Sequence, residues 1–597
     1  MTLTRETVIR RSVLVSLLGM IGWMAAPAPA QACGGFFCDR PPPNPLDPLP
    51  VAQAGENVVF GVEGDPASGN AVVTAHIQIL YSGDAALFSW VVPVLSVPTL
   101  STGTDRLFSS LAGVTQPIFV PQSAVNGVCL PGPSVLNDSA TAGTATGLGG
   151  SAGAAGPPRV NVLFQGAVGP YDAATLQSSD SAELKTWLTD HGYYVDPHAG
   201  QIIDTYVQEG KYFVALRLSN GQDVRSIRPI VLTFHGTEPC VPLRLTTIAA
   251  LPDMPVTVYL LGGARAVPLG FLELKLDELR IDWPSQGSNY AALLGEAAND
   301  AGGNAFVTEY AGPSNIASQL LWSPGRFNAE TLRAALTPAD YVQALIGQGL
   351  ANDAQTLPLL IKYIPMPDAA ISAGITPAMF YANLALYSAQ YPLPPSDLGA
   401  LTDEVVTGII EPRRLAQAMI DGHPYLTRFG TFLSPEEMNQ DPLFTFNDAL
   451  PDVPSRHTSV LRTMCGNFQY LACNAPVRLE LPDGRMAWLR SGIKATSCQP
   501  PRTDDASLTS LPAAEMVWRR GTIGEGTVQI DNVAKIQSAL TAHNASFDPS
   551  GARADSGCGC AVARGRSSPV LGLAGVALAL VSFRARRRPR RDRARRS

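Results

Sequence analysis

The spacing of apolar residues changes from a strand pattern to a helix pattern near the middle of this chain, and that change limits the folds open to it. Between Val73 and Tyr81 apolar and polar residues alternate, which predicts a half-buried β-strand. From Asn328 onward the apolar residues recur every three or four positions instead, which predicts helices. We therefore expect an α+β fold: a β-rich N-terminal domain, a helical middle domain and a small mixed C-terminal domain.

Further segments of the first half also favour strands. Leu87–Val94 follows the turn signal Gly83-Asp84, so it is expected to form a hairpin with the first strand, with Pro93 at an edge or an end. One helix is predicted after the cap Ser179-Asp180-Ser181, ending at Gly192. Further strands are expected at 160–164, 212–218, 230–234, 243–248 and 256–261.

The second half contains helical segments and one hairpin signal. Thr337 and Pro338 are expected to start a helix, and helical spacing continues over 357–364, 377–391 and 398–419. Pro482-Asp483-Gly484 separates two short strands as a hairpin turn, and Asp531 or Asn532 is expected to cap a last helix. The predicted domains are 33–312, with a flexible loop at 138–158 rich in small residues, then 313–460 and 461–546.

The first 32 residues are typical of a secretory signal peptide. Arg5, Arg10 and Arg11 precede an apolar run at 12–24, and Ala30-Gln31-Ala32 fits a cleavage site, as does Ala28-Pro29-Ala30. Removal of 1–32 would leave Cys33 first. A lipoprotein modification of Cys33 and a short membrane anchor are the alternatives.

The last residues predict a sorting tail at 557–597 behind a tether at 547–556. Cys558-Gly559-Cys560 is followed by the apolar segment 569–583 and an arginine cluster from Arg584. The apolar segment is roughly 22 Å long as a helix, short of the ~30 Å hydrocarbon core of a bilayer. An ordinary tail anchor is the alternative.

This order of segments resembles the MYXO-CTERM sorting tail of myxobacterial surface proteins. In that family the tail is removed near the cysteine motif and the protein is displayed on the cell surface. The resemblance implies that Cys558 and Cys560 serve in sorting or lipidation. It also implies that the export machinery and a C-terminal processing protease are partners. The expected location is the cell surface or outer membrane, held through the tail or a lipid, with partial release left open.

The charge distribution argues against nucleic acid as a partner. The chain carries a net −7, to which residues 1–32 contribute +2 and residues 561–597 contribute +10, so residues 33–560 carry −19. Such an acidic surface repels nucleic acid and is little attracted to anionic membranes.

The cysteines indicate an oxidising compartment. Their number before the tail is odd, so at least one is free, lipidated or paired with a tail cysteine. Cys33 and Cys38 are expected to close a small loop; zinc binding there is an alternative, but no second ligand pair follows. One bridge is expected among Cys465, Cys473 and Cys498, and Cys129 is a candidate partner of Cys240. The disulfide candidates are Cys33, Cys38, Cys129, Cys240, Cys465, Cys473 and Cys498.

The sequence predicts no catalytic residue, cofactor or metal ligand set. No nucleophile elbow, zinc-protease motif, phosphate loop or calcium loop is present. The scattered histidines, including His76, His191 and His457, are interpreted as structural. Glu309, in an apolar run, is either a buried acid with a raised pKa or a structural glutamate that is hydrogen-bonded or on an edge strand. Asp172 is expected to fix a turn.

A second resemblance covers roughly Cys33 to Gly312. The Cys33–Cys38 start, the strand at 73–81, Phe88–Pro93, Gly169–Asp172 and Phe306–Tyr310 resemble the domain-of-unknown-function 2330 family of bacterial secreted proteins. That family implies no activity. We therefore expect an exported, surface-anchored envelope protein with a non-catalytic binding or structural role. A secreted hydrolase is the alternative, which a deep pocket lined by Glu309 or by several histidines and acids would favour.

Overall fold

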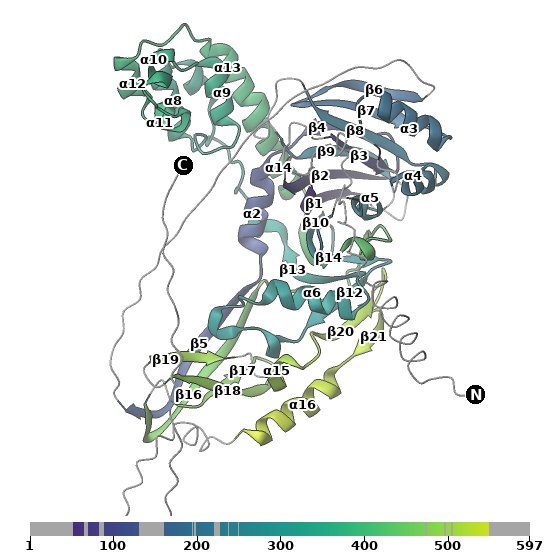
Figure 1. Ribbon diagram of the computed structural model, residues 1–597, viewed down its shortest axis with the longest axis vertical. Helices are drawn as coiled ribbons and strands as arrows, with labels where there is room; N and C mark the ends of the chain where they lie inside the picture. Colours follow the sequence, from purple (N-terminus) through teal and green to yellow (C-terminus); the bar gives the residue numbers. More distant parts are fainter. Residues whose placement is uncertain are drawn as a thin grey trace, which may run out of the picture. The chain divides into compact units, whose positions relative to one another are not determined.

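The computed structural model in Figure 1 describes most of the chain from Ala52 to Phe547. All described residues fall within one unit, Met1–Pro549. The fold is α+β, as predicted, with β-rich sheets first, a helical region at 329–421 and mixed strands and helices at the end. The described residues are 52–64, 70–82, 89–130, 160–193, 195, 199–219, 227–236, 238–248, 250–471, 475–494, 497–502 and 506–547.

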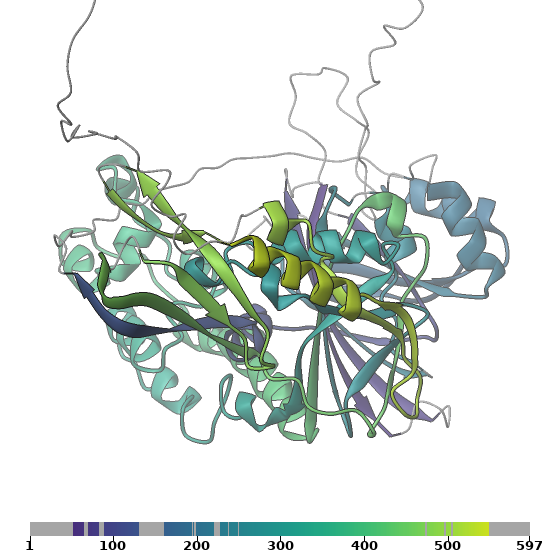
Figure 2. The same ribbon diagram turned by 90° about the horizontal axis from the view of Figure 1, so that it is seen from below.

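A ten-stranded mixed sheet is the largest element of the fold, and its strands fan out in Figure 2, as expected for a twisted sheet. From edge to edge it contains β21 (Thr527–Asp531), β20 (Ala514–Arg519), β12 (Leu272–Leu276), β13 (Ala305–Pro313), β14 (Tyr425–Leu433), β10 (Met254–Gly262), β1 (Ala52–Glu63), β2 (Ala71–Ser82), β9 (Ile230–Gly236) and β4 (Thr99–Thr102). β14 lies between β10 and β13, although the helical region separates it from β13 in the chain. The domain boundaries predicted at 312/313 and 460/461 stay predictions.

A four-stranded antiparallel sheet forms a second layer, in the order β3 (Ser89–Val94), β8 (Tyr212–Leu218), β7 (Tyr171–Gln177) and β6 (Asn161–Val168). The hairpin predicted between β2 and β3 is wrong, because β2 pairs with β1 and β9 while β3 pairs with β8. The two strands face each other across the core instead of sharing an edge. Pro93 lies on edge strand β3, as predicted, where a missing N–H is tolerated.

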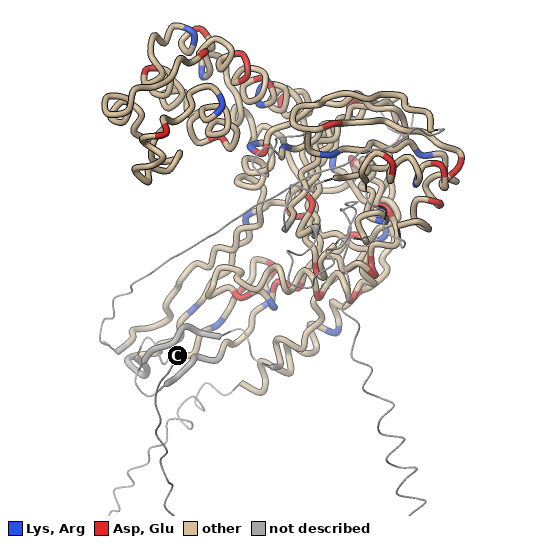
Figure 3. Tube along the Cα trace, turned by 45° about the horizontal axis from the view of Figure 1, so that its top comes forward, with Lys and Arg blue, Asp and Glu red and all other residues tan. Residues whose placement is uncertain are grey.

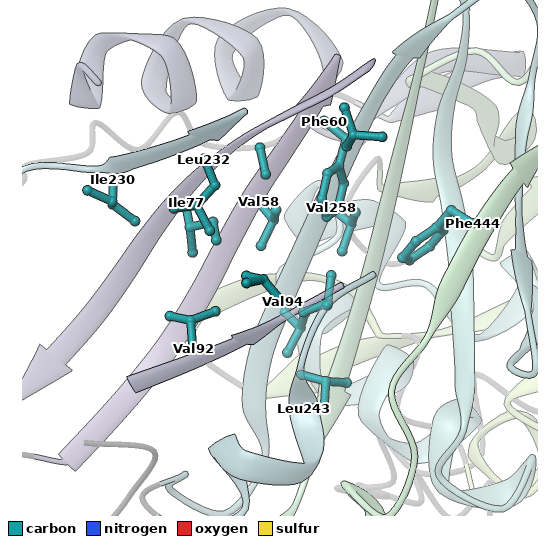
Figure 4. Close-up of a cluster of buried hydrophobic side chains, with 14 of the residues drawn as sticks. Val58, Phe60, Ile77, Val92, Val94, Ile230, Leu232, Leu243, Val258 and Phe444 are labelled. Carbon is teal, nitrogen blue, oxygen red and sulfur yellow. The ribbon is translucent and has the colours of Figure 1, made fainter. Parts of the chain in front are cut away.

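The main core fills the space between these two sheets. Figure 4 shows Val92 and Val94 of β3 across from Val58 and Ile77 of the large sheet. Strand β8 alternates between two cores: Val214 and Leu216 face the main core, while Phe213 and Ala215 face a second core. This period of two is the expected result of a strand that is covered on both faces.

Two helices cover the outer face of the four-stranded sheet, α3 (Ser181–Asp190) and α4 (Ala199–Gln208). The prediction of α3 is confirmed. Asp180 caps it by accepting a hydrogen bond from the Ala182 N–H at 2.8 Å, and Trp187 is buried on its inner face. Gly192 follows the helix with φ of +84°, a backbone conformation that favours glycine.

A five-stranded sheet has the order β19 (Ser497–Arg502), β18 (Met486–Lys494), β17 (Val477–Glu480), β16 (Arg456–Leu471) and β5 (Ile118–Leu130). The predicted hairpin around Asp483 is confirmed as β17 and β18. A separate pair joins β11 (Ala266–Leu269) and β15 (Leu443–Phe446). Parallel strands β5 and β16 form a long ribbon, and most of β5 beyond Phe119 is exposed.

One disulfide ties this ribbon together, between Cys129 of β5 and Cys465 of β16, with the two Cα atoms 4.8 Å apart. The suggested pairing of Cys129 with Cys240 is therefore wrong, and so is a bridge from Cys465 to a cysteine that follows it. Each cysteine lies at an irregularity in the register between β5 and β16, where the two strands bring them together, whereas Cys240 is a free, half-buried cysteine. Cys33, Cys38, Cys473, Cys558, Cys560 and the side chain of Cys498 lie outside the described residues.

The predicted helices of the middle region are confirmed. Residues from Leu332 to Ile410 share one core, whereas Ala416 and Ile420 of the last helix pack in another. Thr337 caps α8 by accepting a hydrogen bond from the Asp340 N–H at 3.1 Å. The middle helices are α7 (Ala329–Arg333), α8 (Pro338–Gly347), α9 (Thr356–Tyr363), α10 (Asp368–Ser372), α11 (Pro377–Ala382), α12 (Leu384–Gln390), α13 (Leu398–Val405), the π-turn η8 (Val406–Ile410) and α14 (Glu411–Asp421).

Other helices lie between or after the strands. The strand predicted at 243–248 is wrong: Leu243–Thr246 is the short helix α5, and short buried apolar runs do not distinguish helix from strand. Asp531 accepts a hydrogen bond from the Val533 N–H at 3.0 Å and starts the predicted last helix, α16 (Val533–Ser546). The others are α2 (Asp105–Thr115), η5 (Glu278–Arg280), η6 (Trp283–Ser285), α6 (Tyr290–Asp300), η7 (Ser314–Ala317), η9 (Pro435–Glu437) and α15 (Ala506–Thr509).

The helices given above can be compared with the thickness of a bilayer. None of them combines the length and the apolar character needed to cross a bilayer. The predicted apolar segment 569–583 lies outside the described residues.

Candidate functional site

A cavity of about 450 Å³ lies beside β12 and β13 and combines apolar walls with several charged groups. We call it the Glu309 pocket, after the residue that the sequence singled out. Its walls come from segments far apart in the chain, which the large sheet brings together. Residues that define it include Phe119, Glu273, Tyr290, Glu309, His457 and Trp518.

A β-bulge in β13 aims Glu309 into this pocket. Thr308 is paired with Phe429 of β14 and Tyr310 with Arg428, so Glu309 between them has no partner in the register. In a regular strand, Thr308 and Glu309 would point to opposite faces, yet both line the pocket. Gly430 leaves room for the carboxylate, because a Cβ atom there would lie 2.7 Å from Glu309 Oε1.

Glu309 is held in a buried ion pair. Its carboxylate accepts a hydrogen bond from the Arg428 guanidinium and another from the Tyr290 hydroxyl at 2.8 Å. Burial and the Glu309 carboxylate both hold the pKa of Tyr290 well above its ordinary value, so the hydroxyl remains a donor. Of the interpretations of Glu309, the structure supports a hydrogen-bonded structural glutamate, but on a central strand and not on an edge.

Glu273 of β12 is the second buried acid of the pocket, and it also has cationic partners. Arg265 pairs with one carboxylate oxygen, and Arg520 Nε donates to the other at 2.6 Å. Thr308 Oγ1 donates to Glu273 at 2.7 Å, which joins this cluster to the bulge. The buried carboxylates of the pocket are therefore balanced by arginines.

His457 lies at the wall of the pocket with an acid beside it. Its Nδ1 is 2.8 Å from Glu278 Oε1, and its ring stacks on Phe119 with centroids 5.0 Å apart. Spacing in the sequence does not reveal this acid, because Glu278 is separated from His457 by 179 residues. Sequence reasoning likewise missed Arg428, whose only signal was an arginine within an apolar run.

The other residues that the sequence singled out lie apart from one another and outside the Glu309 pocket. His191 caps the end of α3, where its Nδ1 contacts the Trp187 carbonyl at 2.8 Å. Asp172 lies in β7 just after the Gly169-Pro170 turn and accepts a hydrogen bond from Ser219 Oγ at 2.9 Å. Among the described residues, no three His, Cys, Asp or Glu side chains gather in a way that could hold a metal ion.

His76 was interpreted from the sequence as a structural histidine, and the structure shows that it is buried without a full set of hydrogen-bond partners. Its side chain is 4% exposed in the middle of the large sheet, and its Nδ1 has no hydrogen-bond partner. Burial lowers its pKa from 6.5 to about 4, because the imidazolium would be desolvated there.

This burial predicts an acid-sensitive fold. The folded pKa lies below the unfolded value, so the stability contributed by neutral His76 is complete above pH 6.5 and is lost as the pH falls toward 4. We expect wild type to lose about 3 kcal/mol more than a His76→Leu variant between pH 7 and pH 4. Urea denaturation across this range measures the difference, with His235→Leu, at an exposed position on β9, as the matched control. Equal pH slopes for wild type and His76→Leu would contradict the burial.

Together, the fold and the pocket define an α+β protein with a small cavity whose buried charges are paired. Residues 69–321 match the family described as "Uncharacterized protein conserved in bacteria (DUF2330)", so the chain contains a domain of that family. No curated protein and no solved structure matches the chain. The matched region contains Glu273, Tyr290 and Glu309, while Arg428 and His457 come from beyond it.

Proposed function

We propose that this chain is an exported protein, anchored at the cell surface, that binds a ligand in the Glu309 pocket without transforming it. The leader at 1–32, the tail at 557–597 and the cysteine usage support export and anchoring. The ribbon disulfide between Cys129 and Cys465 fits an oxidising compartment.

The pairing of the buried acids is the observation that carries the non-catalytic role. A general acid or base must gain and lose a proton near the working pH. Glu309 accepts hydrogen bonds from Arg428 and Tyr290, and Glu273 is held by two arginines. These contacts occupy the carboxylate oxygens and fix their orientation. Such groups suit recognition within an otherwise apolar cavity.

A secreted hydrolase is the second candidate, because acids and a histidine do line this pocket. The pair of His457 and Glu278 is its best support, since the two side chains contact each other at the wall of the pocket. A panel of chromogenic esters, glycosides and peptides tests it. We expect no turnover above buffer. Turnover that is lost in both His457→Gln and Glu278→Gln, with folding intact, would favour the hydrolase.

The location is tested on intact cells. We expect added protease to remove the folded part from the cell surface. N-terminal sequencing of the mature protein should begin at Gln31 or Cys33, and intact mass should show that residues 584–597 are gone. A mature form that retains Met1 contradicts export with cleavage. A surface form that retains the arginine cluster identifies the tail as an ordinary anchor.

A further inference from the structure

A second cavity, of about 440 Å³, lies between the large sheet, the start of α2 and the segment before α9. Asn57 of β1, Gln78 of β2 and Tyr259 of β10 form part of its wall, and Asp105 and Arg228 line it as well. Charged residues make up only 16% of the chain, and Figure 3 shows how sparsely they are spaced along the trace. Several charged side chains lining one cavity are therefore unusual in this chain and need a physical explanation.

Two charged groups of this cavity are neutralised by neighbours. Arg428 is paired with Glu309, and Asp353 is paired with Arg413 at 2.5 Å. These ion pairs hold the β14 wall and the segment before α9 in place.

Asp105 is oriented by hydrogen bonds but forms no ion pair among the described residues. Asn57 donates to Gln78 Oε1 at 2.9 Å, and Gln78 Nε2 donates to Asp105 Oδ1 at 2.7 Å, which fixes the half-buried carboxylate. No side-chain cation of the described residues lies within 4.0 Å of it. Burial raises the pKa of Asp105, an effect that the Gln78 hydrogen bond and the charge of Arg228 oppose.

Two arginines of this cavity, Arg228 and Arg106, have no carboxylate partner within 4.0 Å among the described residues. Arg106 is exposed and donates to the Asn352 carbonyl at 2.8 Å, whereas Arg228 is half-buried. One terminal nitrogen donates to the Gly408 carbonyl at 3.3 Å, while the buried Nε has no hydrogen-bond partner. Burial lowers the pKa of Arg228, since the charged guanidinium is partly desolvated.

We propose that this cavity binds a small zwitterion of the α-amino acid class, whose carboxylate pairs with Arg228 and whose ammonium pairs with Asp105. Half-buried charges without partners are unfavourable, and a ligand that carries both opposite charges satisfies both at once. A guanidinium is suited to bidentate contact with a carboxylate. The volume lies within the roughly 300–1,000 Å³ of small-ligand pockets, so a side chain or a second residue of a dipeptide also fits.

The test is binding to the full chain. Each proteinogenic L-amino acid and the dipeptide L-alanyl-L-alanine are screened by thermal shift, and calorimetry follows with the best of them. We expect its N-acetyl derivative, which lacks the ammonium, and its carboxamide, which lacks the carboxylate, each to bind roughly tenfold or more weakly. The free amino acids and the dipeptide distinguish the two sources of this zwitterionic chemistry.

Two variants locate the site. Arg228→Gln and Asp105→Asn should each weaken binding of the zwitterion roughly tenfold or more. Arg228→Gln should also bind the zwitterion and its carboxamide equally, which loss of folding alone does not explain. The matched control Arg519→Gln removes an exposed arginine of β20 and should bind like wild type.

Two outcomes overturn the proposal. One is that no amino acid or dipeptide binds the wild-type chain. The other is binding that neither Arg228→Gln nor Asp105→Asn weakens, which would place the site elsewhere. This cavity is not the Glu309 pocket. A failure of the zwitterion proposal would therefore leave the function proposed for the Glu309 pocket unchanged.

Discussion

Replacing Glu309 by glutamine is expected to lower the free energy of unfolding by about 3–5 kcal/mol, because it leaves Arg428 buried without its counter-charge. Glutamine preserves the shape of the side chain and its room beside Gly430. The loss of stability therefore measures the removed charge and not an empty space left by a smaller side chain. Denaturant unfolding followed by circular dichroism measures it.

Two further variants make this prediction specific to the ion pair. Glu525→Gln removes an exposed acid of the same pocket and should change stability by less than about 0.5 kcal/mol. Replacing both partners, as Glu309→Leu with Arg428→Met, should recover most of the loss, since a buried pair can be exchanged for apolar groups. Wild-type stability in Glu309→Gln would mean that Glu309 is not held by Arg428, and it would strengthen the hydrolase alternative.

Removing the ribbon disulfide is the second large effect. The bond joins residues 336 apart in sequence, so its loss frees a very long loop in the unfolded chain. We expect the double variant Cys129→Ala with Cys465→Ala to lose about 5 kcal/mol of unfolding free energy on the chain-entropy account. Guanidinium denaturation of oxidised protein measures this.

Cys240→Ala is the control, because Cys240 is free and half-buried, and it should lose far less stability. Peptide mapping without reductant gives a direct check of the pairing. A fragment that links Cys129 to Cys240 would contradict the structure and restore the pairing suggested from sequence.

Local signals in the sequence were reliable for features that depend only on neighbouring residues. The cap at Asp180, the cap at Thr337 and the turn at Asp483 each depend on neighbours only a few positions away. The 243–248 segment failed for a related reason. Its short apolar run is equally compatible with a buried helix and a buried strand.

Local sequence signals could not predict which distant segments pair with each other. Alternation in β2 and apolar character in β3 predicted two strands, but not that they would lie in different sheets. The same limit applied to cysteines, since the partner of Cys129 depends on parallel pairing of β5 with β16. Nothing in the residues around Cys129 specifies that pairing.

The sequence by itself determined that this chain has an α+β fold, where its caps and several of its strands lie, and that it contains strands resembling the DUF2330 family. Only the tertiary structure decided which charges meet. Glu309 was visible as an acid in an apolar run, but its role follows from the bulge that turns it and from Arg428, 119 residues away. Periodicity is a property of neighbouring residues, whereas an ion pair or a cavity depends on segments that only the folded sheet brings together.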